Sequence, residues 1–188
     1  MLESGYCAPA PCFWSRTAAS VRTNREGTSF NVRTNWATGA CMFVRSDAFF
    51  EAGGFDEEFF AHMEEIDLCW RMKNLGYKIY VEPKSIVYHI GGGTLNKSSK
   101  RKTYLNFRNN LTTLTKNHPK EKLLIKILKR LILDGVAAIK FLLGGEPKHF
   151  TAVFRAHWAF YFHLPKILKQ RVELKAKENF QYSLTSVY

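Results

Sequence analysis

The fold of this chain is decided by residues 53–71, which read GGFDEEFFAHMEEIDLCWR. The stretch up to Met63 is a loop rich in acidic and aromatic side chains. From Glu64 to Leu75 the apolar residues recur at helical spacing and leave one polar side, which predicts a helix. The apolar positions are Ile66, Leu68, Cys69, Trp70, Met72 and Leu75. Gly76 follows and is a typical C-terminal stop for a helix.

Three acids, Glu64, Glu65 and Asp67, stand at the start of this predicted helix. One explanation is that the helix dipole stabilises carboxylates at that position. Glu64 and Glu65 are adjacent, however, and two like charges resist joint ionisation, so one carboxyl group is expected to have a raised pKa. Such a carboxylate suits general base catalysis near neutral pH. The residues alone leave both explanations open.

Shorter elements are expected before this helix. The apolar run at residues 41–44 predicts a short buried strand. Ser46 can cap a short helix over residues 47–52. Gly53 and Gly54 follow and are expected to end that helix.

Beyond Gly76, residues 77–81 and 85–89 are rich in β-branched and aromatic side chains, and each predicts a strand. From Lys100 onward the pattern is helical almost throughout. Breaks are expected at His118–Pro119, Gly144–Gly145 and Pro165.

Three regions follow from these patterns, and the fold class is α/β. Residues 1–35 carry neither a helical nor a strand period and are expected to be irregular or poorly ordered. Residues 36–118 hold the predicted strands and the acid-bearing helix. Residues 119–188 are expected to form amphipathic, basic helices.

Charge is distributed unevenly along the 188 residues, whose formal net charge is +12. Residues 46–82 contain nine acids and three bases, whereas residues 116–188 contain fourteen bases and five acids. A hydrophobic content of 46% is typical of a globular protein and excludes wholesale disorder. The basic excess indicates an anionic partner such as nucleic acid, a lipid surface or a phosphorylated substrate.

Cysteine usage and hydropathy limit the cellular setting. The four cysteines form no CxxC pair, which favours reduced thiols in a cytosolic protein. The first ten residues lack the basic start and apolar run of a signal peptide. No uncharged apolar stretch reaches the roughly 18 residues that a membrane-spanning helix needs.

The predicted helix over residues 120–143 is mostly aliphatic, and its cations lie within an arc of roughly 100°. They are Lys122, Lys126, Lys129, Arg130 and Lys140. Either the helix packs in a core with one solvated face, or it lies in a membrane interface with its lysines toward anionic lipid. Aromatic residues at 158 and 160–162, close to His157, His163 and Lys166, suit a headgroup layer and favour the membrane.

Several motifs, in this order and spacing, resemble the acceptor-side half of glycosyltransferase family 2, the inverting enzymes of GT-A fold. They are TGACMFVR at 38–45, GGFDEEFF at 53–60, EEIDL at 64–68, Arg71, Gly76–Tyr77 and VYH at 87–89. The closest likeness is to the rhamnosyltransferase-like branch that builds bacterial surface polysaccharides. The resemblance covers roughly residues 36–118, and the later helices resemble the membrane-associated tails of that branch.

The resemblance implies that an acceptor hydroxyl attacks the anomeric carbon of a nucleotide-sugar with inversion. A carboxylate at the start of the helix would remove the hydroxyl proton. The family usually has Glu-Asp here, with the second acid as the base, which points to Glu65 but leaves Glu64 as the alternative.

The resemblance also implies an acceptor site. Asp67 would orient the site or hold the acceptor, and Arg71 would either contact substrate or pair with Asp67 one turn away. Trp36, Thr38 and Gly39 are further acceptor-binding candidates.

A divalent cation, Mg²⁺ or Mn²⁺, is implied by the same resemblance, with His89 as a ligand beside the donor diphosphate. Gly92, Thr94 and Lys100 resemble a basic flap near that diphosphate, the alternative being a plain surface loop. The expected partners are a nucleotide-sugar, a saccharide or lipid-linked acceptor, and an anionic membrane surface. The expected location is the inner face of the cell membrane, reached from the cytoplasm.

The donor-binding half of the family, which carries an Asp-x-Asp motif, has no counterpart in this sequence. We therefore expect a partial GT-A fold, a fragment that is inactive alone. The alternative is a catalytically dead peripheral-membrane module. Nucleic-acid binding is disfavoured, because no zinc-finger, RRM or helix-turn-helix signature occurs.

Overall fold

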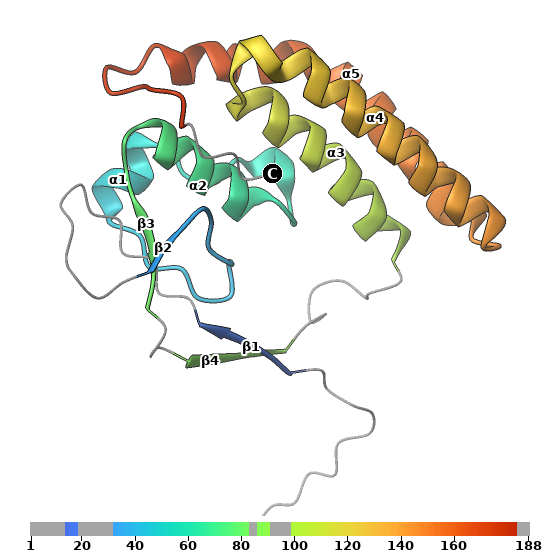
Figure 1. Cartoon of the computed structure of the whole chain (residues 1–188), viewed down its shortest axis with the longest axis horizontal. Helices are drawn as coiled ribbons and strands as arrows, with labels where there is room; N and C mark the ends of the chain where they lie inside the picture. The colour runs from blue at the N-terminus through green and yellow to red at the C-terminus, as the bar shows by residue number, and fades with distance from the viewer. Residues whose placement is uncertain (1–13, 19–31, 83–85, 91–98, 184–188) are drawn as a thin grey trace, which may run out of the picture.

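The computed structural model describes residues 14–18, 32–82, 86–90 and 99–183 (Figure 1). Strands β1 and β2 come first, followed by α1, the short 3₁₀ helix η1, α2, strands β3 and β4, and three long helices. Their bounds are β1 Trp14–Ala18, β2 Val32–Thr34, α1 Ser46–Glu51, η1 Glu57–Phe59, α2 Glu64–Asn74, β3 Ile79–Val81, β4 Ile86–Ile90, α3 Lys100–Asn117, α4 Lys120–Leu143 and α5 Pro147–Lys175. The described part is mostly helical with small sheets, which is compatible with a partial α/β fold.

The sheets are two separate antiparallel pairs. β1 pairs with β4, so that Trp14 lies opposite Ile90 and Ala18 opposite Ile86. β2 pairs with β3, so that Val32 lies opposite Val81. Both β1 and β2 fall within residues 1–35, where the sequence shows no strand period. Their partners lie far along the chain, and pairing of this kind leaves little trace in a local pattern.

The predicted strand over residues 41–44 is wrong. These residues form an irregular segment, and the Phe43 side chain is 64% exposed. Met42 and Val44 instead pack against the edge of the core. The apolar run therefore reflects side chains that cover the core from a loop.

Helices α1 and α2 confirm the predictions for residues 47–52 and 64–75 to within a residue or so. Ser46 is the first helical residue of α1 rather than its cap, because Arg45 occupies the N-cap position. Gly53, Gly54 and Gly76 have φ values of +86°, +65° and +86°. These left-handed conformations are strained for residues other than glycine. They end α1 and α2 at the positions that the sequence predicts.

The long helices break at His118–Pro119 and Gly144–Gly145, as predicted, but not at Pro165. Pro165 lies inside α5, which continues to Lys175. In Figure 1, α3 lies between α2 and the pair formed by α4 and α5. None of the helices in the described ranges is long and apolar enough to cross a membrane.

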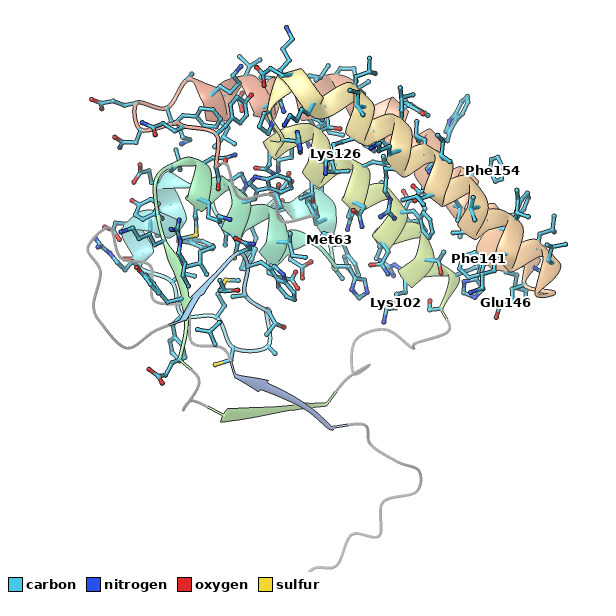
Figure 2. The ribbon with its side chains drawn as sticks, viewed as in Figure 1. Met63, Lys102, Lys126, Phe141, Glu146 and Phe154 are labelled. Carbon is cyan, nitrogen blue, oxygen red and sulfur yellow. The ribbon has the colours of Figure 1, made fainter. Side chains whose placement is uncertain are left out.

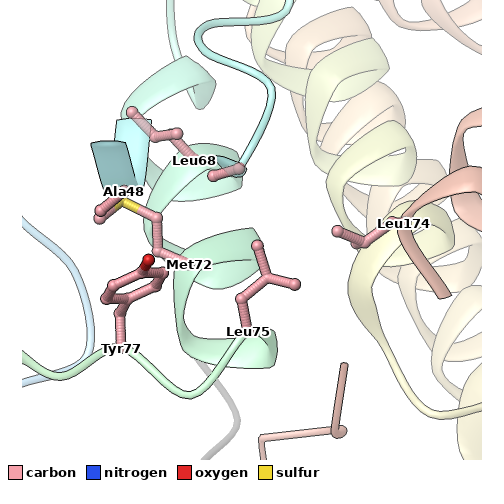
Figure 3. Packing of buried hydrophobic residues seen from close by; sticks show 7 residues of the cluster. Ala48, Leu68, Met72, Leu75, Tyr77 and Leu174 are labelled. Carbon is pink, nitrogen blue, oxygen red and sulfur yellow. The ribbon is translucent and has the colours of Figure 1, made fainter. Parts of the chain in front are cut away.

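The main core forms where α1, α2 and the end of α5 meet (Figure 3). Its buried members are Ala48, Ala52, Leu68, Met72, Leu75, Tyr77 and Leu174. A second cluster joins α3 to α5 through Leu111, Phe160 and Ile167. The C-terminal helix is thus part of the same packed body as the acid-bearing helix α2.

Candidate active site

Glu64 and Glu65 occupy the first turn of α2, directly after the N-cap Met63. Burial, together with the neighbouring Glu64, raises the pKa of Glu65 from 4.5 to about 7. One buried oxygen of each carboxyl group, Oε2, has no hydrogen-bond partner among the described residues. A half-protonated carboxyl group with an unoccupied oxygen can accept a proton from a bound hydroxyl near neutral pH.

The segment from Asn35 to Gly39 runs along the face of α2 that carries Glu65. The Gly39 backbone hydrogen-bonds Glu65, and one turn further on the Ala37 backbone hydrogen-bonds Cys69. A turn later, Lys73 Nζ donates to Asn35 Oδ1 at 2.9 Å.

One of the predicted acceptor-binding residues, Gly39, is thus brought to the candidate base, and Thr38 precedes it in the same segment. Trp36, a further candidate, belongs to this segment and is 43% exposed. Gly39 is exposed, and a Cβ added there would meet nothing within 4 Å.

Asp67 is fully buried and is held by three side chains. Its carboxylate accepts from Arg71 Nε at 2.8 Å, from Lys116 Nζ at 3.0 Å and from Asn117 Nδ2 at 2.8 Å. Burial opposes ionisation, but Arg71 and Lys116 outweigh it and hold the pKa of Asp67 below its ordinary value. Of the two roles predicted for Asp67, these contacts support orienting the site.

Arg71 also has internal partners throughout. Besides pairing with Asp67, its guanidinium donates to the carbonyl of Ala52 and, at 2.7 Å, to that of Gly54. It therefore fastens the loop after α1 to α2. The sequence left Arg71 between substrate contact and pairing with Asp67, and the pairing is what the structure contains.

Several residues missed by the sequence analysis surround these groups. Lys116 bridges Asp67 and Asp56, at 3.0 and 2.7 Å. His62 precedes the two acids, and its buried Nε2 has no hydrogen-bond partner among the described residues. Burial and Lys102 lower the pKa of His62, against the opposing effect of Glu64. None of these residues forms a recognisable motif, because their partners are distant or their burial depends on the folded loop.

Most of the residues predicted to bind the metal or the diphosphate lie outside the described part of the chain. His89 belongs to β4, where its backbone lies opposite Ser15, but its side chain is outside the described set. Gly92 and Thr94 lie outside the described residues, and Lys100 begins α3 with an exposed side chain. No three His, Cys, Asp or Glu side chains of the described ranges gather as a metal site. The divalent cation stays a prediction from the resemblance.

Comparison with known proteins finds similarity to curated glycosyltransferases. The chain is 32% identical over 96 residues to N-acetylglucosaminyl-diphospho-decaprenol L-rhamnosyltransferase of Mycobacterium tuberculosis, which covers 50% of this chain and 31% of that protein. It is 34% identical over 55 residues to Rhamnosyltransferase WbbL of Escherichia coli K12, covering 29% and 21%. It is 36% identical over 55 residues to Pre-mycofactocin glycosyltransferase of M. tuberculosis, covering 29% and 12%.

No protein-family model matches the chain. No solved structure matches it either. The chain spans about a third of the length of the first of these relatives. This chain is therefore similar to curated glycosyltransferases along at most half of its length. Two of these relatives are rhamnosyltransferases.

Proposed function

We propose that this chain is the acceptor-side part of an inverting family 2 glycosyltransferase of GT-A fold, in which Glu65 is the general base. The observation that carries the proposal is the environment of Glu65. This carboxyl group has a pKa of about 7, an oxygen with no hydrogen-bond partner in the described part of the chain, and the Thr38–Gly39 segment beside it. The similarity to curated glycosyltransferases supports the same reaction class.

In the proposed reaction an acceptor hydroxyl is bound beside Glu65. Its oxygen forms a bond to the anomeric carbon of a nucleotide-sugar, from the face opposite the diphosphate. The bond from that carbon to the diphosphate oxygen breaks, so the nucleoside diphosphate leaves with the bonding electrons. Glu65 takes the hydroxyl proton, which makes the oxygen a better nucleophile as the new bond forms. The acceptor would be a saccharide or a lipid-linked sugar.

The test is a chimaera in which residues 36–118 replace the matching region of the mycobacterial rhamnosyltransferase, assayed for rhamnosyl transfer to its named acceptor. We expect transfer by the chimaera, loss of transfer in Glu65→Gln, and retained transfer in the matched Glu64→Gln variant. Full activity with Gln at position 65 would refute the base assignment. A folded chimaera without any transfer would refute the acceptor-side assignment.

A second proposal, peripheral binding to an anionic membrane on its inner face, is favoured by the surface of α4 and α5. Their apolar side chains protrude from the outer side of the helical pair, away from α2 (Figure 2). On α4, nine such residues are 49–83% exposed: Leu124, Ile125, Leu128, Ile132, Leu133, Val136, Ile139, Leu142 and Leu143. On α5 they are Phe154, Trp158, Tyr161, Phe162, Leu168 and Val172. We call these fifteen side chains the apolar face.

A buried polar group fixes this orientation of α4. Asp134 is 1% exposed. One of its oxygens forms an ion pair with Arg130, 2.7 Å from Nε, and His157 Nε2 of α5 lies 3.0 Å from the other oxygen. Asp134 thus faces α5, and the nine exposed aliphatic side chains of α4 point to solvent. Arg130, which the sequence grouped with the lysines of the cationic arc, therefore turns toward Asp134. Ile127 and Leu131 of α4 pack against the cluster that joins α3 to α5, as the core interpretation expects, whereas nine other aliphatic side chains of this helix are exposed.

The charges next to the apolar face support an anionic bilayer as its partner. Lys122, Lys129 and Lys140 are exposed and lie on one flank of the apolar stripe of α4. An apolar stripe beside lysines matches a bilayer surface, where side chains enter the acyl boundary and lysines meet anionic headgroups. A second copy of the chain would bring further positive charge to the same surface, since the net charge is +12. The same face would serve a catalytically dead membrane module.

A further inference from the structure

The loop that leads into α2 has an unusual backbone. Phe60, His62 and Met63 have φ values of 60°, 66° and 75°, in the region that non-glycine residues rarely adopt. Met63 is also the N-cap of α2, and its carbonyl accepts from Asp67 N at 2.8 Å. Strain of this kind persists only where the surrounding structure imposes it. The loop therefore needs an external support.

That support is Asn109, a buried residue of α3 that is 1% exposed. Its Nδ2 amide donates to the carbonyls of Phe59, Ala61 and His62, at 3.1, 2.9 and 2.7 Å. Two N–H groups are thus shared among three carbonyls of one loop. The Asn109 oxygen is itself fixed, because it accepts from Arg108 Nε at 2.9 Å.

Arg108 extends the same support by one residue toward the N-terminus of the loop. Its guanidinium donates to the carbonyl of Glu58 and lies 3.4 Å from that of Phe59. The Phe59 side chain is buried beneath these bonds at 1% exposure. Two consecutive residues of α3 therefore hold the backbone of residues 58–62 from one side.

We propose that Asn109 is a positioning residue, which fastens the loop over residues 59–62 to α3 and thereby fixes Glu65 at the start of α2. The structural part of this inference stands on the hydrogen bonds and backbone angles alone. Its consequence for catalysis rests on the proposed role of Glu65. No group in the loop is assigned to contact substrate.

We expect a change in the loop to alter the pKa of Glu65 by changing how much water reaches its carboxyl group. The described titratable groups that face Glu65 are Glu64 and Cys69 of its own helix, and the segment packed against it contributes the Gly39 backbone. The described residues place no cation there, so the pKa of this carboxyl group depends mainly on exclusion of solvent. Loosening the loop two residues earlier would admit water and lower that pKa toward its ordinary value.

The experiment is an NMR titration of the Glu65 carboxyl carbon in the whole chain, which requires no turnover. We expect Asn109→Ala to lower the pKa of Glu65 by roughly one unit or more. The matched control is Asn110→Ala, which removes the same amide from the next residue of α3. The Asn110 oxygen has no hydrogen-bond partner within the described chain. An unchanged Glu65 pKa in Asn109→Ala would overturn the inference.

A second variant guards against misfolding. Asn109→Ser keeps a hydroxyl donor that is one bond shorter than the amide and cannot serve all three carbonyls, so we expect a smaller shift in the same direction with the helical circular dichroism preserved. If Asn109→Ala unfolds, the absence of any shift in Asn109→Ser overturns the inference. In the chimaera, Asn109→Ala should lower kcat by roughly 10- to 100-fold with little change in KM. A shifted pKa in a chimaera that never transfers sugar would leave the loop support standing and refute the proposed function.

Discussion

The ammonium group of Lys116 lies 3.0 Å from the carboxylate of Asp67, so a cation of α3 neutralises a fully buried acid of α2. Lys116 is itself buried at 4% exposure. A buried charge that loses its partner is costly, because water cannot replace the missing interaction. This contact ties the helix that begins with Glu64 and Glu65 to the helix that carries Asn109.

Replacing Lys116 by Met should destabilise the chain by about 2–4 kcal/mol, because Asp56 and Asp67 both lose a buried partner. Urea denaturation at pH 7 measures the change. The matched control is Lys166→Met, which removes an exposed lysine paired with Glu58. The control should leave the denaturation midpoint almost unchanged. Equal effects of the two substitutions would contradict the importance of burial.

Acid should destabilise the chain through Asp67. Its folded pKa lies below the ordinary value, so the ionised form contributes stability that is present above about pH 4 and is lost as the pH falls further. Asp67→Asn should be less stable than wild type at pH 7 and should lose less stability between about pH 4 and pH 2. Equilibrium unfolding at several pH values tests this. Parallel curves for the two proteins would show that Asp67 does not govern the acid transition.

Glu65 should act on stability in the opposite sense. Its folded pKa of about 7 exceeds the ordinary value of 4.5, so the protonated carboxyl group contributes stability that is complete below pH 4.5 and is lost as the pH rises through 7. Glu65→Gln should therefore stabilise the chain by about 1–3 kcal/mol at pH 8 and have little effect at pH 4.5. Glu57→Gln, which changes an exposed acid of η1, is the control and should show no such dependence. A pH-independent effect of Glu65→Gln would argue against a raised pKa.

Membrane binding should depend both on the apolar face and on the lysines that flank it on α4. Replacing Lys122, Lys129 and Lys140 by Gln should weaken binding to phosphatidylglycerol vesicles by roughly 100-fold, since each lysine near the surface contributes about 1 kcal/mol. Ile132→Asp should also weaken binding, because it places a charge among aliphatic side chains.

Co-sedimentation with vesicles measures this binding. The control removes three cations remote from α4, by changing Arg33, Arg45 and Lys78 to Gln. Equal losses in the control, or equal binding to neutral phosphatidylcholine vesicles, would show that the flank of α4 does not recognise anionic lipid.

Local signals predicted the helices well because they depend on neighbouring residues. The two acids at the start of α2 and the glycines after α1 and α2 act within one turn of chain, and the structure places them as expected. Pro165 is an exception, because packing of α5 along α3 and α4 outweighs the local cost of a proline inside a helix.

The contacts that arrange the candidate site could not be predicted in the same way. Asp67 meets Lys116 and Asn117 about 50 residues further along the chain, and Asn109 meets the loop across a similar separation. These polar residues resemble the ordinary solvated side of a helix until the helices are packed. The pairing of β1 with β4 spans the chain in the same manner: the pattern at 85–89 predicted a strand where β4 lies, whereas β1 left no local period.

The two small sheets have a consequence for the handling of this protein. Each is a ribbon of only two strands, so both outer edges have backbone N–H and C=O groups that no third described strand pairs. Such edges readily accept an additional strand, either from a longer polypeptide or from another molecule. Strand-blocking substitutions in β2 or β3, such as a lysine at an edge position, are therefore expected to raise the solubility of the chain when it is expressed alone.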